Sequence, residues 1–218
     1  MNLLKKYQNK IRKFINPLGF RTILNNNKPN IKILDIGCGN DSPKKVKSLL
    51  PNCYYIGLDI QDYNQNSKLY ADEYHIVNKE VFNETIASFK DLDLIISYHN
   101  IEHVELRPQY IQAVKKALKK GGVIFIATPS QESVNFPSRD GTLNYYDDPT
   151  HKLEPINFVE LLDNFKKDGF KIINSQSRYR PFIYYIIGFI KEVFKPKKTT
   201  FYAWCYYGFE MILVAQKN

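Results

Sequence analysis

Short apolar runs alternate with helical segments along most of this chain, and this alternation restricts the fold more than any other feature. The apolar runs predict strands at 31–36, 54–58, 74–77, 92–97, 123–127, 171–177 and 209–215. Between them, apolar residues at helical spacing predict helices at 43–50, 83–90, 108–120 and 156–167. We therefore expect a doubly wound α/β fold, with a mostly parallel seven-stranded sheet and helices on both faces.

The ends of these elements carry local signals. Ser42 is the expected cap of the helix at 43–50, with Pro43 in its first turn. Gly121 and Gly122 are expected to end the helix at 108–120. Ligands of such sheets bind beyond the carboxyl ends of the strands. The loops that follow the strands are therefore where a site is expected.

The loop after the first strand is rich in glycine and preceded by an acid. Asp35 ends the strand, and Gly37 and Gly39 follow it. Small residues let the backbone approach a ligand closely. A dinucleotide fingerprint needs a glycine where Ser42 stands, and no Gly-Lys-Ser/Thr follows, so neither that motif nor a P-loop is present.

A second acid, Asp59, closes the next strand. A carboxylate in this position suits the two hydroxyls of a ribose. An acid at Asp35 disfavours a pyrophosphate and favours a cationic ligand. S-adenosylmethionine has a ribose and an amino group and no phosphate. The alternative is an ordinary strand-to-helix turn with solvated acids.

The same residues resemble the class I S-adenosylmethionine-dependent methyltransferases. The resemblance covers about residues 30–175 and rests on Leu34–Gly39, Gly57–Asp59, Asp93–Ser97, and Leu118–Gly122 before a strand that ends in Thr128–Pro129. It departs from the common pattern at Asp41, where a third glycine often stands.

The resemblance implies that Gly37 and Gly39 pack against S-adenosylmethionine, that Asp35 lies near its amino acid portion and that Asp59 binds its ribose. The full set of expected cofactor-binding residues is Asp35, Gly37, Cys38, Gly39, Asp59, Ile60, Asn78, Ser97 and Tyr98.

Two segments hold three of the four histidines of the chain. His99, Glu102 and His103 follow the fourth strand, and His151 lies in the long loop after the fifth. Methyl transfer to a hydroxyl needs an aligned acceptor and removal of its proton. We therefore predict Glu102, His103 and His151 as catalytic residues, with His103 or His151 as general base. The alternative is that both histidines only pack or hydrogen-bond within their loops.

The Glu-His-Val and Asp-x-x-His elements resemble small-molecule, quinone-precursor and glycan O-methyltransferases. The first element is also similar to one in the plant small-RNA 2′-O-methyltransferase, which holds a divalent metal. That resemblance implies a metal site made of His99, Glu102, His103 and His151. A histidine at position 99 replaces a carboxylate, which favours a softer ion than Mg²⁺.

The net charge of +9 lies at the two ends of the chain. Residues 1–30 carry seven basic residues and no acid, residues 31–180 carry 19 basic and 20 acidic residues, and residues 181–218 carry five and two. A nucleic-acid enzyme is expected to carry basic residues around its cleft. The distribution therefore makes a nucleic-acid partner less favoured than a small-molecule or glycan acceptor.

We expect a basic helical extension at 1–30, a methyltransferase domain at 31–218, and an apolar helical insertion at about 181–200. The insertion is interpreted either as a buried or dimer-forming helix, or as an interfacial helix that contacts a membrane together with residues 1–20. In the second interpretation, Lys195, Lys197 and Lys198 face anionic head groups of the membrane. The longest apolar run, 182–190, is too short to span a bilayer.

Three cysteines without metal-site spacing, and no secretory signal, predict a reducing, cytoplasmic location, with peripheral membrane contact as an extension of it. The predicted function is transfer of a methyl group from S-adenosylmethionine to an oxygen of a small molecule or glycan, such as a lipid-linked sugar. The alternatives are an RNA ribose O-methyltransferase and a non-catalytic methyltransferase-like partner subunit.

Overall fold

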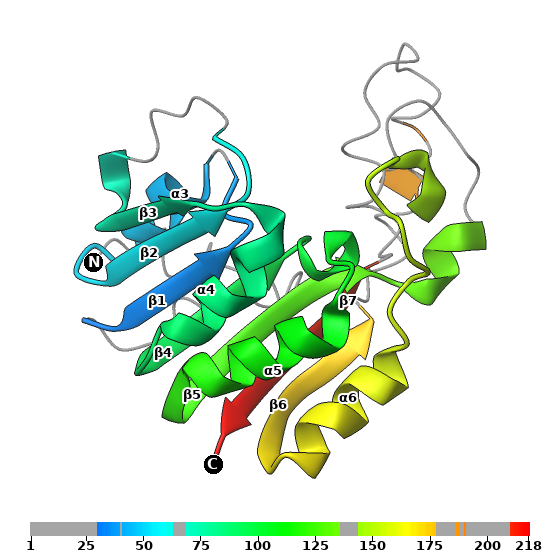
Figure 1. Cartoon of the computed structure of the whole chain (residues 1–218). Coiled ribbons are helices and arrows are strands. Elements are labelled where there is room, and N and C mark those ends of the chain that lie inside the picture. Colours follow the sequence, from blue (N-terminus) through cyan, green and yellow to red (C-terminus); the bar gives the residue numbers. More distant parts are fainter. Residues whose placement is uncertain are drawn as a thin grey trace.

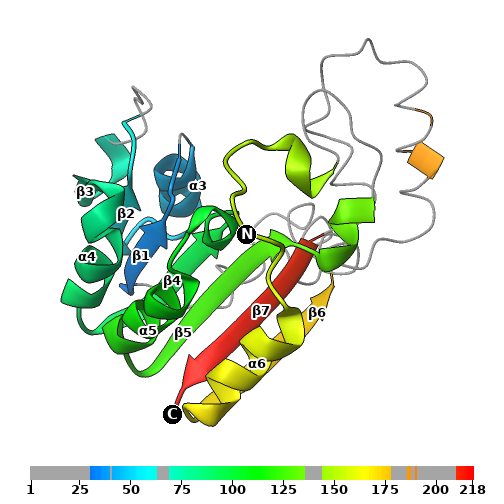
Figure 2. The ribbon, with the colours of Figure 1, turned by 45° about the vertical axis from the view of Figure 1, so that its right-hand side comes forward.

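The computed structural model describes residues 30–39, 41–62, 69–135, 144–177 and 210–218, together with positions 186, 187 and 190. Seven strands form one sheet in the order β3-β2-β1-β4-β5-β7-β6 (Figures 1 and 2). They are β1 (Lys32–Ile36), β2 (Tyr54–Asp59), β3 (Glu73–Ile76), β4 (Leu92–Tyr98), β5 (Leu118–Pro129), β6 (Phe170–Ser177) and β7 (Glu210–Lys217). Only β7 runs antiparallel to its neighbours. The predicted mostly parallel seven-stranded sheet is confirmed.

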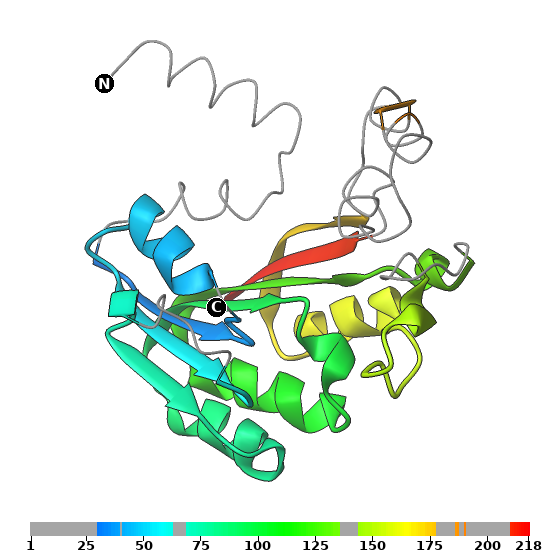
Figure 3. The ribbon, with the colours of Figure 1, turned by 90° about the horizontal axis from the view of Figure 1, so that it is seen from above.

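Helices cover both faces of the sheet, as predicted (Figure 3). One face carries α3 (Ser42–Leu49), and the other carries α4 (Phe82–Ser88), α5 (Arg107–Ala117) and α6 (Phe158–Lys167). Neighbouring residues of a strand point to opposite faces. Ile33 accordingly packs in the cluster that contains Val46 of α3, whereas Leu34 packs in the cluster that contains Val114 of α5.

Among the described residues, four short 3₁₀ helices lie in the loops, and three of them belong to the edge of the sheet where the strands β4 and β5 end. They are η2 (Lys79–Val81), η3 (Ile101–His103), η4 (Gln131–Asn135) and η5 (Tyr145–Asp147). The last three bring the two histidine-bearing segments close to each other, as described below.

The boundary between α5 and β5 differs from the prediction. The helix ends at Ala117, and Leu118 already pairs with Leu92 of β4. Gly121 has a φ of 76°, and a side chain at Gly122 would lie 2.6 Å from the carbonyl oxygen of Leu92. The two glycines therefore permit an irregular start of a long strand next to β4. They do not form the end of the helix.

The start of α3 also differs. Asp41 occupies the N-cap position, and Ser42 is the first helical residue. The Ser42 hydroxyl donates a hydrogen bond to the carboxylate of Asp35. A buried carboxylate needs donors more than an exposed helix end does, because water can hydrogen-bond the free amides of the helix end. The predicted capping role of Ser42 was therefore wrong.

The predicted extension at 1–30 and the predicted insertion at 181–200 lie outside the described residues, apart from Asn30, Ile186, Ile187 and Ile190. These three isoleucines are exposed. Cys38 and Cys53 are buried free thiols. In the described part of the chain, no helix has the length and apolar character needed to cross a membrane.

Candidate active site

The glycine loop after β1 makes a tight backbone turn, as the glycines of its sequence indicate. Gly37 and Gly39 adopt φ values of 68° and 52°, in the left-handed region that favours glycine. The Gly37 amide donates to the carbonyl oxygen of Leu58 at 2.8 Å, which ties the loop to the end of β2. A side chain at Gly37 would lie 2.4 Å from Nδ2 of Asn100. Gly37 therefore lets the segment after β4 approach the loop.

Asp59 lies at the end of β2 beside this loop. Its Oδ2 accepts the Gly39 amide at 3.0 Å, and its Oδ1 accepts the Ile60 amide at 2.8 Å and the Gln61 amide at 3.4 Å. A carboxylate has about four lone-pair positions, so Oδ2 keeps a free acceptor position, while the contact of Oδ1 with Gln61 is long and weak. Ile60 follows as a largely exposed apolar side chain. Asp59 and Ile60 together offer hydrogen-bond acceptors next to an apolar surface, which suits a ribose joined to a base.

Asp35 is the most deeply buried acid of the loop. It accepts hydrogen bonds from Ser42 and from the hydroxyl of Tyr55, the latter at 2.7 Å. Burial raises the pKa of Asp35 to about 6, although both hydrogen bonds oppose the shift. A cation bound nearby would favour the ionised form and reverse this effect.

Cys38 contributes packing at this loop. Burial raises the pKa of its thiol, so the thiol stays neutral at neutral pH. A side chain at Gly57 would lie 3.1 Å from the Cys38 sulfur and 3.0 Å from the ring of Tyr74. The thiol therefore fills the space between β1 and β2.

The other expected cofactor residues lie near the same edge, with different environments. Asn78 directly follows Val77, whose amide donates to the Asp59 carbonyl at 3.0 Å. Ser97 is fully buried, and its hydroxyl accepts from Tyr110 at 2.8 Å. The Tyr98 hydroxyl donates to Glu210 at 3.0 Å. The hydroxyls of Ser97 and Tyr98 thus form hydrogen bonds with other side chains of this chain.

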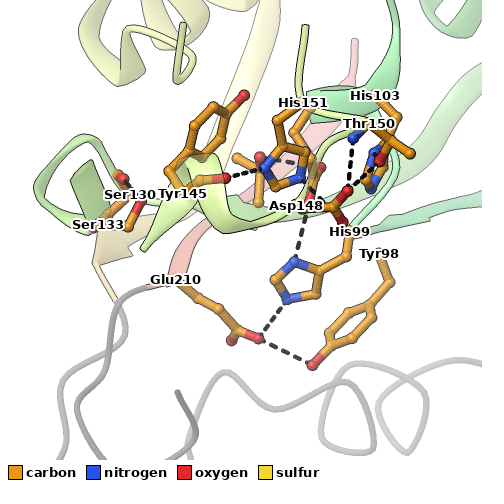
Figure 4. A network of polar contacts seen from close by, with 12 residues as sticks. Tyr98, His99, His103, Ser130, Ser133, Tyr145, Asp148, Thr150, His151 and Glu210 are labelled. Atoms are coloured by element: carbon orange, nitrogen blue, oxygen red, sulfur yellow. Dashed lines mark hydrogen bonds and ion pairs between the residues drawn. The ribbon is translucent and has the colours of Figure 1, made fainter. Parts of the chain in front are cut away.

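The three predicted catalytic residues come together. One donor atom each from Glu102, His103 and His151 lies within 4.8 Å of the others. The two imidazole rings are 4.7 Å apart, and the His151 ring stacks on Tyr145 at 4.2 Å. Figure 4 shows how the loop after β5 carries His151 to the segment that follows β4. Glu102 and His151 are buried, and His103 keeps an exposed edge.

His103 and His151 have different hydrogen-bond partners. Nδ1 of His103 lies 2.8 Å from the hydroxyl of Thr150, and Nδ1 of His151 donates to the Tyr145 carbonyl at 2.6 Å. Burial lowers the pKa of His103 below its usual value, and the charge of Glu102 offsets only part of that shift. His103 is therefore a neutral base at neutral pH.

His99 is held by two buried carboxylates. Its Nδ1 lies 3.1 Å from Glu102. Its Nε2 lies 2.8 Å from Glu210 (Figure 4). Burial alone would lower the pKa of His99, but these two hydrogen bonds and charges raise it to about 10. Because both ring nitrogens face carboxylates, His99 is an imidazolium and the structure does not bring it into the cluster as a metal ligand.

Glu102 joins the imidazolium to the cluster. Burial would raise its pKa, but the hydrogen bond and the charge of His99 lower it overall. Its other oxygen accepts from Thr128 at 3.2 Å. One carboxylate and two imidazoles are ligands that intermediate divalent ions accept. Glu102, His103 and His151 therefore fit a divalent ion by their chemistry as well as a metal-free base.

Three residues of this network have no role in the sequence-based prediction. Asp148 is the acid of the Asp-x-x-His element and Thr150 lies within it, but the pattern does not show that they contact His103. Glu210 stands at the start of β7, far along the chain from His99. Glu210 comes near the end of β4 because the strands are ordered β4-β5-β7 in the sheet, and no local sequence pattern specifies this order.

The chain matches a protein family described as "Methyltransferase domain" over residues 3–175. It is 33% identical over 102 residues to a ubiquinone biosynthesis O-methyltransferase of Pelagibacter ubique, a match that covers 45% of this chain and 42% of that protein. The chain spans less than half the length of the curated relatives it matches.

Solved structures share the fold. A SAM-dependent methyltransferase from Archaeoglobus fulgidus covers 97% of this chain and 100% of its own with a TM-score of 0.55 and 18% identity. The plantazolicin methyltransferase BpumL, solved with S-adenosylhomocysteine, covers 98% of this chain and 88% of its own with a TM-score of 0.61 and 19% identity. Since the family match covers most of the chain and includes the glycine loop, the chain belongs to the class I S-adenosylmethionine-dependent methyltransferases.

Proposed function

We propose that this methyltransferase transfers the methyl group to an oxygen of a small molecule or glycan, including a lipid-linked sugar, with His103 as the general base. The observation that carries this proposal is a neutral imidazole, within a cluster of ionisable side chains, at the carboxyl end of β4. Asn100 joins this segment to the cofactor loop, because it lies against Gly37.

Besides an aligned acceptor, methyl transfer to a hydroxyl requires the protein to remove the hydroxyl proton. When bound, S-adenosylmethionine supplies an activated methyl group. His103 removes the proton of the acceptor hydroxyl, and the oxygen forms a bond to the methyl carbon while the carbon–sulfur bond breaks. Glu102 stabilises the imidazolium that His103 becomes, because its carboxylate is held ionised by His99. The weak similarity to an O-methyltransferase of ubiquinone biosynthesis is consistent with an oxygen acceptor.

An acceptor screen tests the proposal. The full chain is incubated with methyl-labelled S-adenosylmethionine and, in separate reactions, with hydroxylated small molecules, glycans, lipid-linked sugars and RNA. We expect label in one of the first three classes. Label in RNA alone would favour the alternative of a ribose O-methyltransferase, which the near-neutral charge of residues 31–180 does not support. Bound cofactor without label in any class would favour a non-catalytic partner subunit.

Cofactor affinity is expected to depend on pH through Asp35. The raised pKa of about 6 means that Asp35 is protonated in the free chain below that pH. A cationic amino group nearby favours the carboxylate, so binding must release this proton. Affinity for S-adenosylmethionine should then fall about tenfold per pH unit below pH 6 and be constant above about pH 7.

Calorimetry in two buffers of different ionisation enthalpy measures the released proton directly. Asp35→Asn removes the titrating group, so its affinity should be weaker and independent of pH over the same range. Equal affinities of the unmodified chain at about pH 5 and 7 would show that Asp35 does not contact the amino acid portion of the cofactor.

A divalent metal is the second candidate, favoured by the gathering of Glu102, His103 and His151. A bound ion would lower the pKa of the acceptor hydroxyl and orient it. A chelator distinguishes the two mechanisms. If His103 is a metal-free base, methyl transfer after chelation should stay within about twofold of the untreated rate. Loss of about 100-fold or more, reversed by Mn²⁺ or Zn²⁺, would assign the three residues to metal binding instead.

We further propose that residues 1–20 and 181–198 make a peripheral membrane contact at a cytoplasmic location, with a homodimer as the alternative use of the apolar segment. The exposed Ile186, Ile187 and Ile190 give support to an apolar contact there. The basic charge of residues 1–30 gives support to anionic head groups.

A further inference from the structure

Thr150 lies between an acid and the proposed base. Its hydroxyl donates to Oδ1 of Asp148 at 2.5 Å, and Nδ1 of His103 lies 2.8 Å from the same hydroxyl (Figure 4). The Thr150 backbone amide also donates to Oδ1 of Asp148, at 2.8 Å. The three side chains form a chain of contacts that ends on the His103 ring.

The protons of this chain can be assigned from its distances. Oδ1 of Asp148 accepts the Thr150 backbone amide at 2.8 Å, so this oxygen acts as an acceptor and carries no proton that it could donate to the Thr150 hydroxyl. Two oxygens 2.5 Å apart repel each other unless a proton lies between them, and Thr150 has only one hydroxyl proton. That proton therefore points to Asp148.

The second contact then needs a proton from the imidazole. With its own proton directed to Asp148, the Thr150 oxygen can only accept at the 2.8 Å contact. Nδ1 of His103 must carry a hydrogen in order to donate. A neutral imidazole has one N–H, so the other nitrogen, Nε2, keeps its lone pair.

We propose that Thr150, anchored by Asp148, is a positioning residue that fixes the neutral His103 ring with its proton on Nδ1 and its lone pair on Nε2. This inference rests on the proposed function, in which His103 accepts the proton of the acceptor hydroxyl. In a Ser-His-Asp triad a carboxylate performs the same task directly. Here the Thr150 hydroxyl accepts the proton of His103 Nδ1, and Asp148 fixes the direction of that hydroxyl.

The other two histidines of this region give internal controls. The Tyr145 carbonyl can only accept, so Nδ1 of His151 carries a proton for a reason that does not involve Thr150. His99 faces a carboxylate at each nitrogen and is doubly protonated. Ring-nitrogen NMR of the full chain with ¹⁵N-labelled histidine should therefore distinguish the doubly protonated His99 from His103, and single substitutions assign the signals of the four histidines.

The test compares Thr150→Val and Thr150→Ser with the unmodified chain at a pH where His103 is neutral. In the unmodified chain and in Thr150→Ser, His103 should be protonated on Nδ1. In Thr150→Val, which removes the hydroxyl at nearly constant volume, a large part of the His103 population should change to the Nε2–H form, with the His151 signals unchanged. An unmodified His103 protonated on Nε2, or the same tautomer in Thr150→Val, would overturn the proposal.

A second variant covers the case in which Thr150→Val does not fold. Asp148→Ala frees the Thr150 hydroxyl to donate to Nδ1 and should also change the tautomer, whereas an unchanged tautomer there would overturn the proposal. With the acceptor from the screen, kcat of Thr150→Val should fall between about 10- and 10⁴-fold with the KM of the cofactor unchanged, and Thr150→Ser should recover most of the loss. If the NMR result holds while His103→Gln is fully active, the positioning role stands and the general-base function fails.

Discussion

Asp59→Ala is expected to reduce the affinity for S-adenosylhomocysteine by about 100-fold or more. After it has accepted the Gly39, Ile60 and Gln61 amides, the carboxylate keeps a free acceptor position on Oδ2 and a weakly used one on Oδ1, where the Gln61 amide is 3.4 Å away. Two ribose hydroxyls can donate to it, and each hydrogen bond to a charged group contributes about 1.5–3 kcal/mol. A sum of about 3 kcal/mol corresponds to about 100-fold in affinity.

Calorimetric titration with S-adenosylhomocysteine measures this loss. Asp41→Ala is the matched control, because Asp41 lies where the glycine loop meets α3, but its side chain is 72% exposed and pairs only loosely with Lys45 at 3.9 Å. Its affinity should equal that of the unmodified chain. Thermal unfolding of both variants separates a loss of binding from a loss of folding. An Asp59→Ala chain that is folded and binds as tightly as the unmodified chain would remove Asp59 from the cofactor site.

His103→Gln is expected to lower kcat by about 10²- to 10⁴-fold, which is the usual contribution of a general base. The amide keeps a polar group beside Thr150 but has no basic nitrogen. The affinity for S-adenosylhomocysteine should be unchanged, since His103 lies beyond the Asn100 contact with the cofactor loop. Steady-state kinetics with the acceptor from the screen, together with calorimetry, separates the two effects.

His75→Gln is the control for this substitution. His75 lies on β3 at the edge of the sheet and pairs with Glu73 at 2.7 Å, away from the β4 end. Its kcat should match that of the unmodified chain. A His103→Gln enzyme with a kcat within about twofold of the unmodified value would show that another group removes the proton.

The fold was predictable because its strands carry strong local signals. Buried apolar runs such as that around Ile33 and Leu34 identify parallel strands covered on both faces, and both residues are fully buried. Parallel strands place their carboxyl ends at one edge, so Asp35 and Asp59 were expected to be neighbours. The Asp59 contact with Gly39 is in accord with that expectation.

The α5–β5 boundary was not predictable, since it depends on tertiary contact. Leu118 has apolar spacing that suits a helix, but pairing with Leu92 of β4 draws it into the sheet. Local periodicity does not show whether Leu118 buries more surface and forms more hydrogen bonds in a longer helix or in the sheet. Ser42 is a similar case, because its hydroxyl can cap a helix or donate to Asp35, and the buried acid has the stronger need.

The site was predictable in part for the same reason. His103 and His151 follow strands that end side by side, so their approach was expected from topology. The charge state of His99 was not, because it depends on Glu210 from an antiparallel strand at the other end of the chain. The resemblance to the plant small-RNA 2′-O-methyltransferase implied a metal ligand at His99, whereas the fold places a carboxylate at each of its ring nitrogens.

The proposed oxygen acceptor is tested by the chemical identity of the bond that the transferred methyl group forms. The full chain is supplied with ¹³C-methyl S-adenosylmethionine and the acceptor from the screen, and the ¹³C spectrum of the purified product is recorded. We expect a single labelled carbon in the methoxy region, bonded to oxygen. A labelled methyl group bonded to nitrogen, sulfur or carbon would contradict the proposed function of His103, whatever the affinity of the chain for its cofactor.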